Sequence, residues 1–215
     1  MFGDPDCSCM GFYFNCFAPD GRGRPVPVDS DPRFLAAEEA FLLRIRTMLA
    51  GRQDLLQGLN CLSEPMEVRL HAGTDFYDWE EHLHFYGRVT HDGDSLILEL
   101  AVDQILTGCH GPHDALDVVI HEMMHVLDYL DDLDDGELAF WDDAARVRFR
   151  AVREEERTRL RAGDSVLDDY ALISDVEFLA VVGESFFVEP TRLLTSSPEL
   201  YALLADYFRV DPAAA

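Results

Sequence analysis

Apolar side chains recur at helical spacing in the first part of the chain. They are Phe34, Leu35, Phe41, Leu42, Ile45 and Leu49. Asp31 followed by Pro32 is typical of a helix cap and first helical position, and Gly51 is typical of a helix end. The pattern predicts a helix that begins at Pro32, ends before Gly51 and turns these apolar side chains to the core.

The pattern changes to a period of two after residue 65. Apolar and polar residues alternate over 66–71, and two further segments, His84–Val89 and Ser95–Leu100, flank His91-Asp92-Gly93-Asp94. A polar Asp-Gly turn between two such segments is typical of a β-hairpin. We therefore expect three strands in the middle of the chain.

From residue 114 onward the pattern is mainly helical. The predicted helices are Asp114–Tyr129, Glu137–Arg161, Asp175–Val188 and Pro198–Phe208. With the strands, they predict an α+β fold that is mostly helical and has a small mixed sheet. The acidic loop of residues 128–136 weakly suggests calcium, but it lacks the register and final Glu of a calcium-binding loop, so a solvated loop is the simpler interpretation.

Charge and composition narrow the function classes. The 215 residues carry 42 acidic and 17 basic side chains, a formal charge of −25, and every basic residue is Arg. Such a surface repels phosphate backbones and anionic lipid, so we expect no nucleic-acid and no membrane partner. There is no apolar run of roughly 20 residues and no secretory signal at Met1–Asp6, and five cysteines favour a reducing compartment, so we expect a cytoplasmic protein.

Residues 1–31 read as a loose arm rich in Gly and Pro. The arm contains Cys7, Cys9 and Cys16. Their spacing differs from that of structural zinc sites and no fourth ligand follows nearby, so we expect free thiols rather than a metal site. His82 and His84 are spaced like two residues on one strand face, for which a polar face is a simpler interpretation than a metal pair.

The segment His121-Glu122-Met123-Met124-His125 is an H-E-x-x-H sequence. On a helix, His121 and His125 lie one turn apart on one face, so both imidazoles can bind one cation. Glu122 is rotated by about 100° from His121, which places its carboxylate beside the cation rather than on it. The motif is typical of zinc hydrolases with a Glu base. The alternative is two partly buried helical histidines with a surface Glu.

A catalytic zinc ion usually has a third protein ligand. His125 is the last histidine, and Asp128 and Asp131 stand where the metzincin pattern needs Gly and His, so a downstream carboxylate is the natural candidate. Asp128 also lies three residues after His125, where it can accept an imidazole N–H.

Glu177 and Glu184 are the candidates for that carboxylate. They lie seven residues apart on one face of a strongly apolar segment, where carboxylates are costly unless paired or metal-bound. Ser174-x-x-Glu177 also matches a capping box, in which Glu177 folds back onto the helix start. Spacing alone does not choose between the two.

Two ordered segments resemble the Mlc titration factor A (MtfA) family of peptidases. The matching residues are Val119–Asp128, similar to the family's H-E-x-x-H-x-L-D helix, and Tyr170 with Glu177–Phe187, Pro190 and Pro198–Tyr201, similar to its second signature. The resemblance covers about residues 115–212 and is absent from the arm. The chain departs from the family at Met123-Met124, where Phe-Ala is usual, and at Gly183, where Ser is expected.

The resemblance implies a zinc-dependent peptidase whose core is similar to the catalytic domain of anthrax lethal factor. It therefore implies one zincin-like catalytic domain over residues 32–215 that holds one Zn²⁺ ion. The implied ligands are His121, His125 and Glu177. Glu122 is implied as the base, Tyr170 as the group that stabilises the oxyanion, and Glu184 as a partner that supports a ligand.

These expectations lead to a zinc metallopeptidase that cleaves peptide or protein substrates. An extended substrate could pair with the edge of Ser95–Leu100, unless that strand lies inside the sheet. The alternative function is regulatory, since the family's namesake binds a transcriptional repressor, and the chain could keep its zinc site and sequester such a partner. A structural zinc site is disfavoured, because such sites have four protein ligands, commonly Cys, and no Cys lies near the motif.

Overall fold

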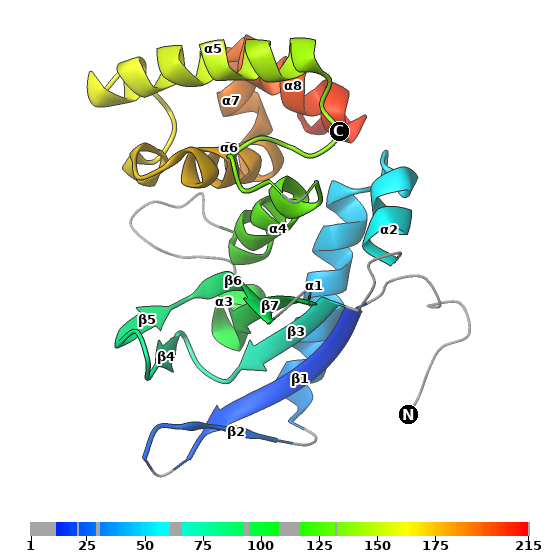
Figure 1. Ribbon diagram of the computed structural model, residues 1–215, viewed down its shortest axis with the longest axis vertical. Helices are drawn as coiled ribbons and strands as arrows, with labels where there is room; N and C mark the ends of the chain where they lie inside the picture. Colours follow the sequence, from blue (N-terminus) through cyan, green and yellow to red (C-terminus); the bar gives the residue numbers. More distant parts are fainter. Residues whose placement is uncertain are drawn as a thin grey trace. The chain divides into compact units, whose positions relative to one another are not determined.

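A computed structural model describes residues 12–20, 22–28, 31–60, 66–92, 95–107, 117–131 and 133–214. The chain divides into two compact units, residues 1–107 and 108–215, which are treated separately (Figure 1). The α+β class with a mixed sheet is confirmed. The single catalytic domain over residues 32–215 stays a prediction.

The first unit is built on a mixed five-stranded sheet with the order β2-β1-β3-β7-β6. Its strands are β1 (Phe12–Pro19), β2 (Pro25–Pro27), β3 (Met66–His71), β6 (Gly87–Asp92) and β7 (Ser95–Ala101). The β1–β3 and β3–β7 pairs are parallel, whereas β1–β2 and β6–β7 are antiparallel. Two shorter strands, β4 (Phe76–Asp78) and β5 (Leu83–Phe85), form a separate antiparallel pair.

The sheet corrects two predictions. The predicted loose arm is wrong at 12–19 and 25–27, which form two strands, with Cys16 opposite Leu70 in the parallel pair; Cys7 and Cys9 lie outside the described residues. The segment Ser95–Leu100 offers no free edge, because β7 is hydrogen-bonded to β3 on one side and to β6 on the other. The interior-strand alternative is the correct one.

The hairpin formed by β6 and β7 is confirmed, although its first strand begins at Gly87 rather than at His84, and the turn residues Gly93 and Asp94 lie outside the described residues. The two nearby histidines do not share a strand face. His82 lies in a turn at φ 59° and hydrogen-bonds the Tyr77 hydroxyl, whereas His84 in β5 contacts Asp75. Each therefore has a local polar partner.

Three helices accompany the sheet: α1 (Pro32–Met48), α2 (Gln53–Asn60) and α3 (Val102–Thr107). As predicted, Asp31 caps α1, accepting a hydrogen bond from the Arg33 amide. Phe41 of α1 is fully buried, and its ring meets those of Phe12 and Phe14 on β1 edge-on at 5.3 and 5.6 Å. The core assignment of Leu35 is wrong, because that side chain is 62% exposed.

A buried polar group on the interior strand β7 makes this unit sensitive to acid. The Glu99 carboxylate, 4% exposed, lies 3.0 Å from His71 Nε2 and 2.6 Å from Arg88 Nε. Burial opposes ionisation, but the hydrogen bonds from His71 and Arg88 and the positive charge of Arg88 outweigh it and hold the pKa of Glu99 below its ordinary value. The ionised form therefore stabilises the fold above the unfolded-state pKa, and this stabilisation is lost as the pH falls through the lower folded-state pKa.

We expect Glu99→Gln to lower the free energy of unfolding by about 2 kcal/mol at pH 7, and the difference from wild type to shrink below about pH 4. Urea unfolding at both pH values checks this, followed through Trp79 in a Trp141→Phe background, since these residues are the two tryptophans. Glu81→Gln, at a side chain that is 56% exposed, serves as the control. A difference that stays constant with pH would contradict the assignment.

The second unit is helical in its described residues. Its elements are α4 (Val118–Tyr129), α5 (Asp143–Arg161), η1 (Asp169–Leu172), α6 (Asp175–Val188), α7 (Pro190–Ser196), α8 (Pro198–Phe208) and η2 (Pro212–Ala214). The bounds of α6 and α8 match the predicted ones, whereas α5 begins six residues later than expected, because Asp142 rather than Glu137 caps it. None of the helices among the described residues has the length and apolar character needed to cross a membrane.

Helices α4 and α6 pack against each other (Figure 1), and η1 packs against α6. Both are apolar on most sides, and most of their residues are buried. The polar side chains on them are therefore exceptions, and most of the site residues predicted from the sequence are among these exceptions.

Candidate metal centre

Helix α4 presents the two histidines of the motif on one face. Asp117 caps the helix by accepting hydrogen bonds from the Val119 and Ile120 amides. The rings of His121 and His125 lie 5.0 Å apart, as expected one turn apart. Glu122 between them is 5% exposed, so the surface Glu of the alternative interpretation is not observed.

Helix α6 brings Glu177 to both imidazoles. Its Oε2 atom lies 3.0 Å from His121 Nε2 and 3.8 Å from His125 Nε2. One ligand atom from each of these residues falls within 4.8 Å of the others, the arrangement of a three-donor metal site in the described chain. Ser174 does cap α6 by accepting from the Glu177 amide at 3.1 Å, but the Glu177 carboxylate contacts His121.

Glu184, two turns further along α6, lies behind His121. Its Oε1 is hydrogen-bonded to His121 Nδ1, and its Oε2 accepts from the Asp117 amide at 3.2 Å. A hydrogen bond at Nδ1 fixes the ring and leaves Nε2 facing Glu177. The geometry thus separates two carboxylates that spacing could not: Glu177 lies between the two rings, and Glu184 holds one of them from the other side.

Asp128 is fully buried but does not hydrogen-bond an imidazole in the described contacts. Its two oxygens accept from the backbone amides of Gly136 and Glu137, at 2.9 and 3.2 Å. Burial raises the pKa of Asp128 to about 7. The residue therefore ties the loop after α4 back onto the helix. The predicted solvated loop is observed at Leu133 and Asp134, which are exposed, whereas Arg146 binds Asp131 at 2.6 Å and lies 3.6 Å from Asp135.

Tyr170 lies in η1, beside the cluster. Its ring centroid is 5.9 Å from that of His121, and the residue is 44% exposed. Burial and the charges of Glu177 and Glu122 raise the pKa of the phenol, and a hydrogen bond from it helps to lower the pKa of Glu177. The hydroxyl is therefore protonated at neutral pH and able to donate a hydrogen bond.

The cluster has the electrostatics of a cation site. Burial raises the pKa of Glu122 to about 7 and that of Glu184 to about 6, and burial lowers that of His125 to about 4. For His121, burial is outweighed by the hydrogen bonds to Glu177 and Glu184, which raise the pKa to about 10. Two imidazoles and one carboxylate are a donor set of catalytic zinc sites, so the residues fit such an ion.

The two departures from the family pattern meet in space. Gly183 of α6 lies directly against Met124 of α4, and a Cβ atom at Gly183 would overlap Met124 Cγ, Sδ and Cε. A large side chain on one helix is thus accommodated by a missing side chain on the other. The two departures lie far apart in the sequence, and the structure shows that they are in contact.

A cavity of about 390 Å³ lies elsewhere, in the first unit. Its lining includes the aromatic side chains of Phe17, Tyr77 and Trp79, and none of the clustered ligand residues contributes to it.

A helix that carries H-E-x-x-H, with a carboxylate from a second helix at its two imidazoles, is an arrangement typical of metallopeptidases. The chain belongs to the glucose-regulated metallo-peptidase M90 family, whose sequence pattern matches residues 63–209. It is also similar to Mlc titration factor A of Edwardsiella ictaluri (strain 93-146), with 32% identity over 103 residues. That match covers 44% of this chain and 39% of the relative, so the chain aligns with about two fifths of the relative's length.

Proposed function

We propose that the chain is a zinc-dependent peptidase that hydrolyses peptide bonds by activating a water molecule with Glu122. The observation that carries the proposal is the convergence of His121, His125 and Glu177, with their ligand atoms within 4.8 Å of one another. Two nitrogen donors and one oxygen donor favour zinc among the common divalent ions, and a three-residue set leaves a position for substrate or water.

The roles of the side chains follow from their places. His121, His125 and Glu177 would hold one zinc ion, which supplies Lewis acidity toward the scissile carbonyl and the attacking water. Glu122, on the same helix turn, takes the proton of that water and delivers it to the leaving amine.

Two further side chains support the reaction in this proposal. The Tyr170 hydroxyl donates a hydrogen bond to the oxyanion, an effect typically worth a few kcal/mol. Glu184 accepts a hydrogen bond from His121 Nδ1 and so keeps the tautomer in which the unprotonated Nε2 faces Glu177 and the metal site. Such support commonly strengthens metal binding.

A second candidate function is the binding of a regulator. The relative's name describes it as a titration factor of Mlc, and a chain similar to it could bind such a protein instead of cleaving it. The five cysteines favour a reducing compartment, so we place either activity in the cytoplasm.

Removal of the metal is the experiment that tests the peptidase. A mixed library of short peptides is incubated with the zinc-loaded chain, with the chelated chain, and with the chelated chain to which zinc has been returned. We expect cleavage in the first and third samples and none in the second, with the cleaved bonds read by mass spectrometry. A chain that binds one zinc ion and cleaves no peptide in any sample would leave the binding function as the better account.

A further inference from the structure

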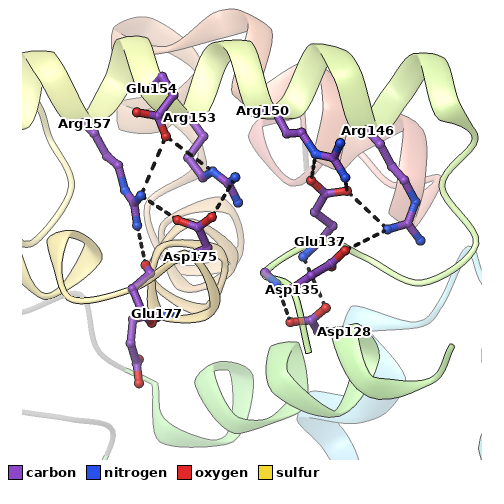
Figure 2. A network of polar contacts seen from close by, with 12 residues as sticks. Asp128, Asp135, Glu137, Arg146, Arg150, Arg153, Glu154, Arg157, Asp175 and Glu177 are labelled. Atoms are coloured by element: carbon purple, nitrogen blue, oxygen red, sulfur yellow. Dashed lines mark hydrogen bonds and ion pairs between the residues drawn. The ribbon is translucent and has the colours of Figure 1, made fainter. Parts of the chain in front are cut away.

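Helix α5 contributes no ligand, yet it carries a row of arginines on one face. Arg146, Arg150, Arg153 and Arg157 follow one another at intervals of four, three and four residues, a spacing that keeps side chains on one side of a helix. Figure 2 shows all four reaching from α5 toward the acidic residues below it. Sequence reasoning did not single out this row, although its spacing was a visible signal.

The second pair of this row holds the start of α6. Arg157 donates to Asp175 Oδ1 at 2.6 Å and to the Ser174 carbonyl, and Arg153 Nη2 lies 2.8 Å from Asp175 Oδ2 (Figure 2). Ser174 in turn caps the Glu177 amide. The guanidinium groups of Arg153 and Arg157 are nearly buried, and two Arg153 nitrogens have no hydrogen-bond partner in the described structure. The short ion pairs with Asp175 offset this burial most strongly, beside longer contacts to Glu154 and the rings of Phe149 and Phe178.

The first pair holds the end of α4. Arg146 and Arg150 both bind the carboxylate of Glu137, which is 1% exposed. The Glu137 amide donates to Asp128, which lies on α4 one turn after His125.

The contacts of the two arginine pairs meet at the loop before α5. Gly136 has φ 74°, and a Cβ atom there would overlap the backbone carbonyl of Asp175. The loop that Asp128 fastens to α4 therefore touches the first residue of α6. The two ligand-bearing helices, α4 and α6, are therefore both held at this point by this loop and by α5.

We propose that the arginine row of α5 is the positioning device of the metal centre, which sets where Glu177 stands relative to His121 and His125. The inference rests on the proposed function, because it concerns the ligands of the same ion. Removal of a group that orients a ligand typically weakens metal binding by 10- to 100-fold. The ligands themselves stay intact in such a variant, so the loss arises from their placement.

Metal binding by Arg157→Gln tests the proposal without reference to turnover. We expect its zinc affinity, measured by competition with a chromophoric chelator, to fall about tenfold or more. We also expect the visible absorption of the cobalt-loaded chain to change, since the carboxylate ligand shifts. Arg157→Lys keeps the charge toward Asp175 but not the second bond, and should recover part of the affinity. Asp175→Asn removes the charge that both guanidinium groups meet but keeps an oxygen that can accept a hydrogen bond from them, so the variant should fold with reduced stability and act like Arg157→Gln in metal binding.

Arg159→Gln is the matched control. Arg159 lies on the same helix and binds Glu156 at 2.7 Å and the Ser196 carbonyl at 2.9 Å, and its hydrogen bonds among the described residues go to neither ligand helix. We expect this variant to lose thermal stability. Its zinc affinity should stay within twofold of wild type, and the visible spectrum of its cobalt-loaded form should be unchanged.

Each outcome separates the two proposals. Wild-type affinity and spectrum in both Arg157→Gln and Asp175→Asn would overturn the positioning role alone, as would an equal loss in Arg159→Gln. A wild-type chain that binds zinc and cleaves no peptide would overturn the peptidase, while the affinity comparison would still decide the role of the arginines. A wild-type chain that binds neither zinc nor cobalt would overturn both.

Discussion

Glu122→Gln is expected to bind zinc as tightly as the wild-type chain and to cleave peptides at least about 100-fold more slowly, because a positioned general base contributes roughly 10²- to 10⁴-fold. Gln has nearly the same shape as Glu but cannot take the proton of the attacking water. The position is 5% exposed, and burial already disfavours the charged carboxylate there, so the neutral side chain should not unfold the helix. The measurement is kcat/KM on the best peptide from the library, with zinc content determined on the same samples.

Two comparisons make this result specific. Glu122→Asp keeps the carboxylate but draws it back by one methylene, so it should retain more activity than Glu122→Gln. His125→Ala, which removes a proposed ligand, should lose both zinc and turnover. A Glu122→Gln chain that cleaves at the wild-type rate would show that the base lies elsewhere, and full binding of a regulator by an inactive Glu122→Gln would favour the second candidate function.

The second large effect concerns the contact between α4 and α6. Met124→Ala should lower the free energy of unfolding by about 2–5 kcal/mol, since it leaves a cavity in a fully buried place. Gly183→Ala alone should also destabilise, because the overlap with Met124 outweighs the helix propensity of about 1 kcal/mol that Ala adds. Combined with Met124→Ala, the same Gly183→Ala change should stabilise by about 1 kcal/mol, as the new methyl enters vacated space.

The test is the change of sign in the effect of Gly183→Ala on the free energy of unfolding. It is measured by urea unfolding of the metal-free chain, followed through Trp141 in a Trp79→Phe background. Met123→Ala is the matched background, because Met123 is equally buried on α4 but is not among the atoms nearest to Gly183. In that background, Gly183→Ala should destabilise as it does in the wild-type chain. Additive effects in the Met124→Ala background would mean that the two helices adjust freely and that the departures are independent.

The sequence predicted best those features that depend on nearby residues. The bounds of α6 and α8 follow from their caps and prolines, and the motif spacing alone places His121 and His125 on one face. Features that depend on distant pairing were harder to predict. The segment at Phe12–Pro19 is a strand because it pairs with β3, more than fifty residues further on. Its own Cys-containing sequence does not indicate that partner.

The candidate site shows the same division. Spacing left Glu177 and Glu184 equivalent, because both face the same side of α6. Their difference arises from where α4 crosses that face, with one carboxylate at Nε2 of His121 and the other at Nδ1. The role of Asp128 was expected from its place one turn after His125, but the open amides of the loop at Gly136 and Glu137 are its partners instead. A local pattern cannot show which of two nearby partners a buried carboxylate finds.

The position of β1 bears on how this protein can be divided. The family pattern begins at residue 63, so a fragment cut to that match would keep β3, β7 and β6 but would lose β1, β2, α1 and α2. Strand β3 would then be an edge, with a row of open amide and carbonyl groups and the apolar side chains of Met66, Val68 and Leu70 beside it. Such an edge is a template for pairing with other chains and for aggregation. The residues before the matched segment thus protect one edge of β3, and removing them would expose that edge to other chains.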